Sequence, residues 1–222
     1  MTSENEPLPL QRRPLATRDK PWARKVAAAL AAWGVAPNAI SLASVAFAIL
    51  AGLALWRSGS SDGAMRVILL LAAAAGIQLR LLCNMLDGMI AIEGGKRTPY
   101  GDLYNDVPDR FADVAFLVGA GYGINQLPFG AVLGWAAAVA ALLTAYIRVL
   151  GGAMGVTQYF AGPMAKQHRM ATLTIACIVS VFEPLWHGNG QVMEIALALI
   201  VAGSLAGFVR RLRLICTEIA RR

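Results

Sequence analysis

The sequence predicts an all-α protein that crosses a membrane six times. Its 222 residues are 57% hydrophobic and only 15% charged, and their mean hydropathy is +0.56. Soluble domains carry about 25% charged residues, so this composition excludes an ordinary soluble domain as well as a disordered chain. A helix needs about 20 apolar residues to cross a bilayer. Six segments reach or approach that length: roughly 38–56, 65–92, 103–124, 129–150, 170–186 and 191–209.

The breaks between these segments contain residues that favour turns. They are 58–63, 94–99, 125–128, 151–167 and 187–190, which are rich in Gly, Ser, Asn and Pro. Glu183 and Pro184 lie near the end of the fifth segment. We therefore expect residues 37–213 to form one six-helix transmembrane domain, followed by a basic cytoplasmic tail at 214–222.

Residues 19–34 predict an amphipathic helix that lies in the membrane interface. Pro21 suits the first turn of a helix, and Gly34 suits its end. Apolar residues recur at helical spacing, opposite Arg24 and Lys25: Trp22, Val26, Ala29, Leu30 and Trp33. An extension of the first span is the alternative, which Gly34 and Pro37 disfavour. Residues 1–18 mix acids, bases and prolines, which predicts a disordered cytoplasmic tail and not a signal peptide.

The net charge of +7, from 20 basic and 13 acidic residues, suits either a nucleic acid or a membrane surface. With six spans both termini share one side, and sixteen basic residues fall on it: Arg12, Arg13, Arg18, Lys20, Arg24, Lys25, Lys96, Arg97, Arg148, Lys166, Arg169, Arg210, Arg211, Arg213, Arg221 and Arg222. The other side holds Arg57 and Arg66. Basic residues mark cytoplasmic loops, so the pattern predicts cytoplasmic termini and no nucleic-acid partner.

Polar residues concentrate where the second segment ends and the third begins. One helical face of the second segment carries Asn84, Asp87, Gly88 and Ala91, and an arc of about 100° on the third carries Asp102, Asn105, Asp106, Asp109 and Asp113. The two stripes should face each other at the inner leaflet. Carboxylates this close require compensating cations, which favours Mg²⁺ or Mn²⁺ with oxygen ligands. Internal ion pairs with Arg80, Arg97 and Arg110 are the alternative.

These residues resemble the CDP-alcohol phosphotransferase family, whose signature is D-x2-D-G-x2-A-R-x8-G-x3-D-x3-D. The spacing aligns without gaps, with five matches and three departures: Asn84, Asp87, Gly88, Ala91, Ile92, Gly101, Asn105 and Asp109. The departures are Asn84, Ile92 and Asn105. Pro37-Asn38 with Ser41 is also similar to a family motif at the start of the first span.

The resemblance implies an enzyme that moves a phosphatidyl or other phospho-alcohol group from a CDP-alcohol, such as CDP-diacylglycerol, to an acceptor hydroxyl and releases CMP. It implies that Asn84, Asp87, Asn105 and Asp109 form the metal site and that Asp109 is a metal ligand or the general base. The two asparagines reduce the charge of these positions from −4 to −2, so we expect one or two Mg²⁺ or Mn²⁺ ions. The family also implies phospholipid biosynthesis and a homodimer.

The remaining candidate residues would contact substrate. Gly88, Ala91 and Gly101 leave room beside the backbone, and Lys96 or Arg97 could reach the diphosphate. Arg148, Lys166 and Arg169 form a basic rim suited to a lipid or acceptor phosphate, with membrane anchoring as the alternative. The pairs Gly119-x3-Gly123 and Gly203-x3-Gly207 predict close packing within the bundle and not a dimer seam.

Two other functions remain open at this stage. The two asparagines suggest a divergent family member that binds nucleotide or lipid without turnover. Intramembrane carboxylates also occur in transporters, although the sequence shows no inverted repeat. Frequent Ala and Gly with short loops indicate a bacterial cytoplasmic membrane, with the site facing the cytoplasm.

Overall fold

The computed structural model describes residues 21–93, 101–125 and 127–221 of the chain. In these residues every regular element is helical, as the sequence predicts. The elements are α1 (Pro21–Ala32), α2 (Pro37–Ser58), α3 (Gly63–Glu93), α4 (Gly101–Gly123), α5 (Gly130–Ala153), α6 (Lys166–Ser180), the 3₁₀ helix η2 (Glu183–Trp186) and α7 (Gln191–Ile219).

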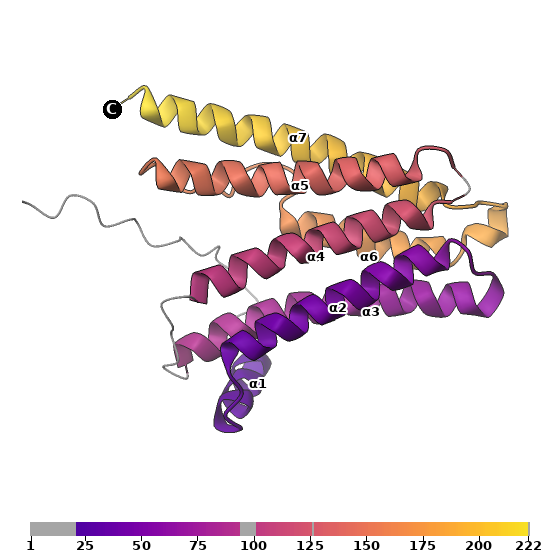
Figure 1. Cartoon of the computed structure of the whole chain (residues 1–222), viewed down its shortest axis with the longest axis horizontal. Coiled ribbons are helices and arrows are strands. Elements are labelled where there is room, and N and C mark those ends of the chain that lie inside the picture. Colours follow the sequence, from indigo (N-terminus) through magenta and orange to yellow (C-terminus); the bar gives the residue numbers. More distant parts are fainter. Residues whose placement is uncertain (1–20, 94–100, 126, 222) are drawn as a thin grey trace, which may run out of the picture.

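Helices α2 to α7 lie side by side along the long axis of the molecule, and α1 projects across one end of the bundle (Figure 1). The C-terminus lies at this same end, which we call the α1 end (Figure 1). The opposite end, called the far end, holds residues 59–62, 124–125, 127–129 and 181–190.

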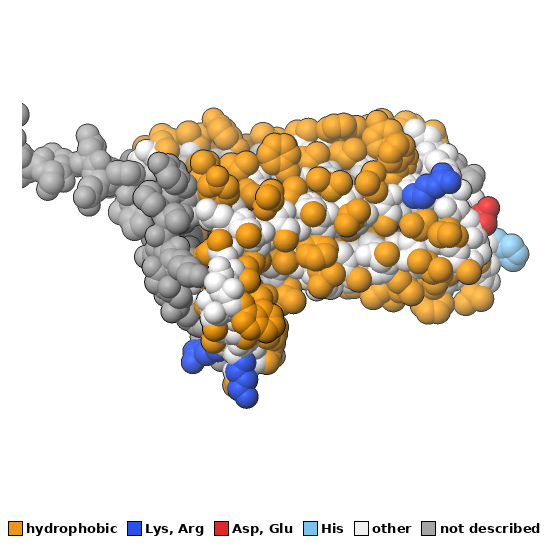
Figure 2. Space-filling model, turned by 60° about the horizontal axis from the view of Figure 1, so that its bottom comes forward, with side chains coloured by type: hydrophobic (Ala, Val, Ile, Leu, Met, Phe, Trp, Pro, Cys, Tyr) orange, Lys and Arg blue, Asp and Glu red, His pale blue; other side chains and the backbone are white. Residues whose placement is uncertain are grey.

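Among the described residues, four helical segments are long and apolar enough to cross a membrane: Pro37–Ser58, Gly63–Ile90, Gly130–Ala153 and Gln191–Ile219. Hydrophobic side chains cover the flank of the bundle in Figure 2, and charged side chains gather at α1 and at the far end. The protein is therefore an integral membrane protein. Helices α4 and α6, the predicted third and fifth spans, lie outside this set, because α4 carries several charges and α6 is only 15 residues long. The count of six spans stays a prediction.

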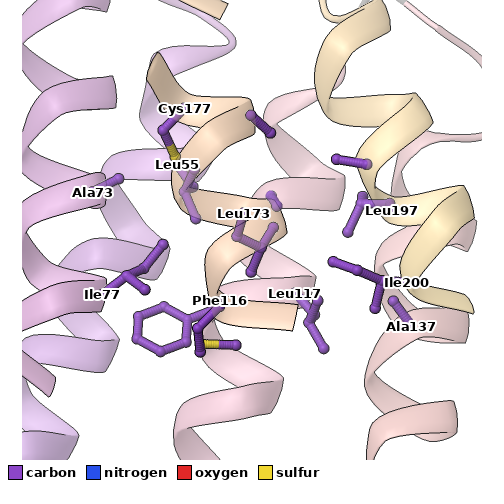
Figure 3. Packing of buried hydrophobic residues seen from close by; sticks show 14 of the residues in the cluster. Leu55, Ala73, Ile77, Phe116, Leu117, Ala137, Leu173, Cys177, Leu197 and Ile200 are labelled. Atoms are coloured by element: carbon purple, nitrogen blue, oxygen red, sulfur yellow. The ribbon is translucent and has the colours of Figure 1, made fainter. Parts of the chain in front are cut away.

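The bundle core joins all six helices from α2 to α7 (Figure 3). Leu55 of α2, Ile77 of α3, Phe116 of α4, Leu173 of α6 and Leu197 of α7 are all almost completely buried. Lipid is as apolar as leucine, so helices in a membrane associate through close packing and small residues.

The Gly119-x3-Gly123 pair shows this close packing between α4 and α2. A Cβ at Gly119 would collide with the carbonyl oxygen of Gly52, and one at Gly123 would collide with that of Leu55. The prediction that this pair packs within the bundle is confirmed.

Helix α1 contacts the bundle through small residues. Ala23 and Ala27 are fully buried and pack against the cluster that contains Met89 of α3. Trp22 and Trp33, on the predicted apolar face, are 46% and 80% exposed. Leu30 of the same predicted face packs against this cluster, so only part of the apolar face points away from the bundle. The interfacial location of α1 stays a prediction.

Helix α7 continues to Ile219, so its last turns run through most of the predicted tail at 214–222. Apolar contacts hold this extension, because Ile215 packs with Ile147 and Val156. The Tyr159 hydroxyl also donates to a carboxylate oxygen of Glu218 at 2.7 Å. That hydrogen bond raises the pKa of Tyr159, which keeps its hydroxyl protonated as a donor.

Candidate functional site

The candidate site lies at the α1 end, where the second half of α3, the first half of α4 and the start of α6 meet. Arg80, Asn84 and Asp87 follow one another at spacings of four and three residues, which places them on one face of α3. Asp106, Asp109 and Asp113 share a face of α4 in the same way. The two polar stripes therefore meet as the sequence predicts.

Asp109 is the centre of this contact and is 8% exposed. The Arg80 guanidinium donates to its Oδ1 at 2.5 Å, and the Asn84 amide donates to the same oxygen. The Lys166 ammonium donates to Oδ2, and Arg110 lies 3.9 Å from that oxygen. Both carboxylate oxygens of Asp109 thus accept hydrogen bonds from other helices, Oδ1 from α3 and Oδ2 from α6.

Asp87 is bound differently. The Ser41 hydroxyl of α2 donates to its Oδ2 at 2.7 Å, whereas Oδ1 is buried and has no hydrogen-bond partner among the described residues. A buried acceptor without a donor costs about 1–3 kcal/mol, so such an oxygen calls for a water, a ligand or a cation. Ser41 belongs to the Pro37-Asn38 motif at the start of the first predicted span, and its hydrogen bond to Asp87 gives that motif a physical role.

Two further ion pairs join α4 to its neighbours. Arg169 of α6 donates to Asp113 at 2.7 Å, and both side chains are at most 3% exposed. Arg148 of α5 donates to Asp106 at 2.7 Å, with Arg110 at 3.3 Å from the same oxygen. Buried charges need such partners, because an isolated charge in a low-dielectric interior is strongly unfavourable.

These contacts change how the basic rim is interpreted. Arg148, Lys166 and Arg169 all pair with carboxylates of α4, so each is part of an internal network. The internal ion pairs considered as an alternative are present for Arg80 and Arg110.

Other predicted residues are placed only in part. Gly88 is buried in α3, and Gly101 is the first residue of α4. Ala91 and Asn105 lie in helices, but their side chains, like that of Asp102, are outside the described residues. Lys96 and Arg97 lie wholly outside them.

Sequence reasoning treated Arg80 only as a pairing partner, although it is a central residue. It is fully buried, and its Nε and Nη1 have no hydrogen-bond partner in the part of the chain that the structure describes. Its position four residues before Asn84, on the same face and inside an apolar segment, was the available signal.

The α5–α6 link, residues 154–165, positions Lys166 and Arg169. Its backbone lies on α7, where a Cβ at Gly207 would come within 2.7 Å of the Pro163 carbonyl oxygen. Gly162 adopts φ +122°, which favours glycine, and Arg211 of α7 donates to the Ala161 carbonyl at 3.0 Å. The Gly203-x3-Gly207 pair thus packs within the bundle as predicted, but against a link and not a helix.

No cluster of three or more carboxylate, imidazole or thiolate side chains able to hold a metal ion occurs among the residues whose side chains are described. Asp87 and Asp109 are carboxylates, whereas Asn84, which contacts Asp109, supplies only an amide. A cation here would rely on few acidic ligands.

Three solved structures of *Mycobacterium tuberculosis* phosphatidylinositol phosphate synthase (PgsA1) resemble the chain. The form with CDP-DAG bound aligns with a TM-score of 0.73 and 21% identity over 87% of this chain and 92% of that one. The form with manganese and citrate gives 0.74 and 21% identity over 88% and 89%. The apo form gives 0.71 and 21% identity over 87% and 95%. The chain therefore has the fold of this synthase.

A curated relative agrees with a membrane location. The chain is 27% identical to the inner membrane protein YnbA of Escherichia coli (strain K12) over 174 residues. This alignment covers 75% of this chain and 79% of YnbA. No protein-family model matches the sequence. In this fold, Asn84 and Asp109 come into direct contact.

Proposed function

We propose that the protein is a CDP-alcohol phosphotransferase of phospholipid biosynthesis. It moves a phosphatidyl or other phospho-alcohol group from a CDP-alcohol, with CDP-diacylglycerol as donor, to an acceptor hydroxyl and releases CMP. The observation that carries the proposal is the contact between Asn84 and Asp109, which unites the two halves of the signature from α3 and α4. The fold shared with PgsA1, which has been solved with CDP-DAG bound, supports it.

Asp109 is the proposed general base. The acceptor oxygen attacks the phosphorus next to the lipid or alcohol moiety, the bond from that phosphorus to the CMP oxygen breaks, and the hydroxyl proton passes to Asp109. Oδ2 is the oxygen available for this step, because its partner Lys166 is 24% exposed at the end of a flexible side chain. Arg80 stays on Oδ1 and keeps the carboxylate oriented.

A divalent cation fits the Asp87 side of the site. The buried Oδ1 of Asp87, which has no partner among the described residues, suits a hard cation. The carbonyl oxygens of Asn84 and Asn105 are proposed as further ligands, with water or substrate oxygens at the remaining positions. When bound, Mg²⁺ or Mn²⁺ supplies positive charge for the diphosphate and the leaving CMP. The PgsA1 structure with manganese supports this choice of ion.

The basic residues of the site would bind phosphate groups. Arg148 and Lys166 are partly exposed and would contact a substrate phosphate beside their acids on α4. Arg169 is buried against Asp113 and would add positive charge behind them. Lys96 and Arg97 are proposed for the diphosphate. Gly88, Ala91 and Gly101 would leave space for the nucleotide.

The proposed topology has six spans, with both termini and the site on the cytoplasmic side of a bacterial inner membrane. The positions of α1 and the C-terminus at one end of the bundle support it, as does the likeness to YnbA. The exposed apolar flank leaves surface for membrane lipids and for the second copy of a homodimer.

The test uses the purified full chain in detergent micelles with CDP-diacylglycerol, Mn²⁺ or Mg²⁺ and a panel of alcohol acceptors, and it measures CMP release. We expect metal-dependent release, with losses of about 10²-fold or more in Asp87→Ala and Asp109→Ala. Asp62→Ala is the matched control, because Asp62 lies at the far end. Nucleotide binding without release for any acceptor would contradict the enzyme and indicate a binding protein.

A further inference from the structure

The pairing of Asp109 raises a question about charge that the proposed function leaves open. A site with two divalent ions stabilises a diphosphate when enough carboxylates surround the ions. Here two of the four signature positions are neutral, Asn84 and Asn105. Fewer carboxylates bind fewer metal ions. The missing positive charge would then have to come from basic side chains of the protein itself.

The structure shows two such cations on Asp109. Arg80 is completely buried and donates to Oδ1, so it has no path to water and remains a fixed part of the site. Lys166 donates to Oδ2 from the opposite side, at the start of α6. The Asn84 amide also donates to Oδ1, which directs its nitrogen, and not its carbonyl oxygen, toward Asp109.

We propose that the Lys166 ammonium takes the place of one of two divalent ions, so that the chain binds a single Mg²⁺ or Mn²⁺ ion on the Asp87 side. The contrast between the two carboxylates supports this assignment. Asp87 has one oxygen on Ser41 and one buried oxygen without a described partner. Both oxygens of Asp109, by contrast, already accept hydrogen bonds from protein cations, Oδ1 from Arg80 and Oδ2 from Lys166. The inference rests on the proposed function and adds that Lys166 neutralises negative charge beside Asp109, the proposed base.

The link geometry makes Lys166 suitable for this role. The residues before it are held on α7 by Gly207 and by the Arg211 hydrogen bond to Ala161, so its backbone is fixed. Its side chain is partly exposed and can follow a phosphate group as substrate enters. A monovalent ammonium also needs no acidic ligands beyond Asp109.

The experiment counts bound Mn²⁺ by the electron paramagnetic resonance signal of free Mn²⁺, with the full chain in micelles and Mn²⁺ alone as the probe. We expect one tight ion per chain in the wild type. In Lys166→Met, loss of the competing charge should tighten Mn²⁺ binding by about tenfold. Lys166→Arg, which keeps the charge, should bind Mn²⁺ like the wild type.

Lys25→Met is the matched control, since it removes the same charge from an exposed position on α1. Two equally tight ions in the wild type would overturn the inference. So would a change of less than about threefold in Lys166→Met relative to Lys25→Met, since the missing ammonium should have a clear electrostatic effect. CMP release on the same samples separates the two proposals: release with an unchanged Mn²⁺ profile refutes only the Lys166 inference, whereas the expected profile without release refutes only the enzyme.

Discussion

Replacement of Glu183 by Gln should destabilise the bundle without disturbing the candidate site at the other end. Glu183 lies in η2 and is fully buried. Its Oε2 accepts from Arg66 at 2.5 Å and from the Gly190 N–H at 3.2 Å, and its Oε1 accepts from the Val192 N–H at 2.9 Å. One carboxylate thus connects the start of α3 with the start of α7.

The magnitude follows from what glutamine loses. Its amide keeps one acceptor, so at least one of these donors loses its partner and Arg66 loses its counter-charge. Breaking a buried ion pair costs about 3–5 kcal/mol. The Arg66 side chain is 17% exposed and can reach water, so we expect the lower part of that range or slightly less, about 2–3 kcal/mol. For a chain of this size that corresponds to a melting temperature lower by about 4–12 °C.

The assay is thermal unfolding in micelles, followed by tryptophan fluorescence, combined with a double-mutant cycle. Arg66→Met alone should also destabilise, and the double variant should lose less than the sum of the two single losses. Arg57→Met is the control, because Arg57 is exposed and its described side-chain partner is Ser60. Additive losses, or a Glu183→Gln variant as stable as Arg57→Met, would refute the reasoning.

Two other predictions concern the α5–α6 link and α1. In Gly207→Ala the new Cβ would lie 2.7 Å from the Pro163 carbonyl oxygen and would displace the link. The control is Gly121→Ala, whose Cβ would lie 2.6 Å from Gly134 at the contact of α4 with α5. We expect CMP release to fall more in Gly207→Ala than in this control. Equal activity per folded molecule in the two variants would show that the link does not position Lys166. Trp33 is 80% exposed on the predicted interfacial face, so brominated lipids should quench wild-type fluorescence more than that of Trp33→Phe. Equal quenching would place Trp33 outside the bilayer.

Helix positions could be predicted well from the sequence because apolar length and turn residues are local properties. The predicted segment 129–150 became Gly130–Ala153, and the predicted interfacial helix at 19–34 became Pro21–Ala32. The end of α7 could not be predicted in this way. Residues 214–219 belong to the predicted basic tail at 214–222, yet they are helical, because Ile215 packs against apolar residues of α5 and of the link.

The sequence predicted which residues form the candidate site better than it predicted which of them pair with one another. The spacing of Asn84, Asp87 and Asp109 already placed them on facing stripes. The link that brings Lys166 to Asp109 contains no periodic pattern, and its course depends on Gly207 far along the chain. Ser41 likewise reaches Asp87 across 46 residues of sequence.

The sequence by itself determined that this is an all-helical membrane protein with a polar, acid-rich site at one end. Hydropathy and helical periodicity depend only on residues that are close together in the sequence. Only the tertiary structure decided which charge neutralises which. An ion pair depends on distances between helices, so Lys166, which the sequence placed on a basic rim, was found on Asp109. The same packing left one oxygen of Asp87 without a described donor, which is why we propose Asp87 for the metal and Asp109 for the proton.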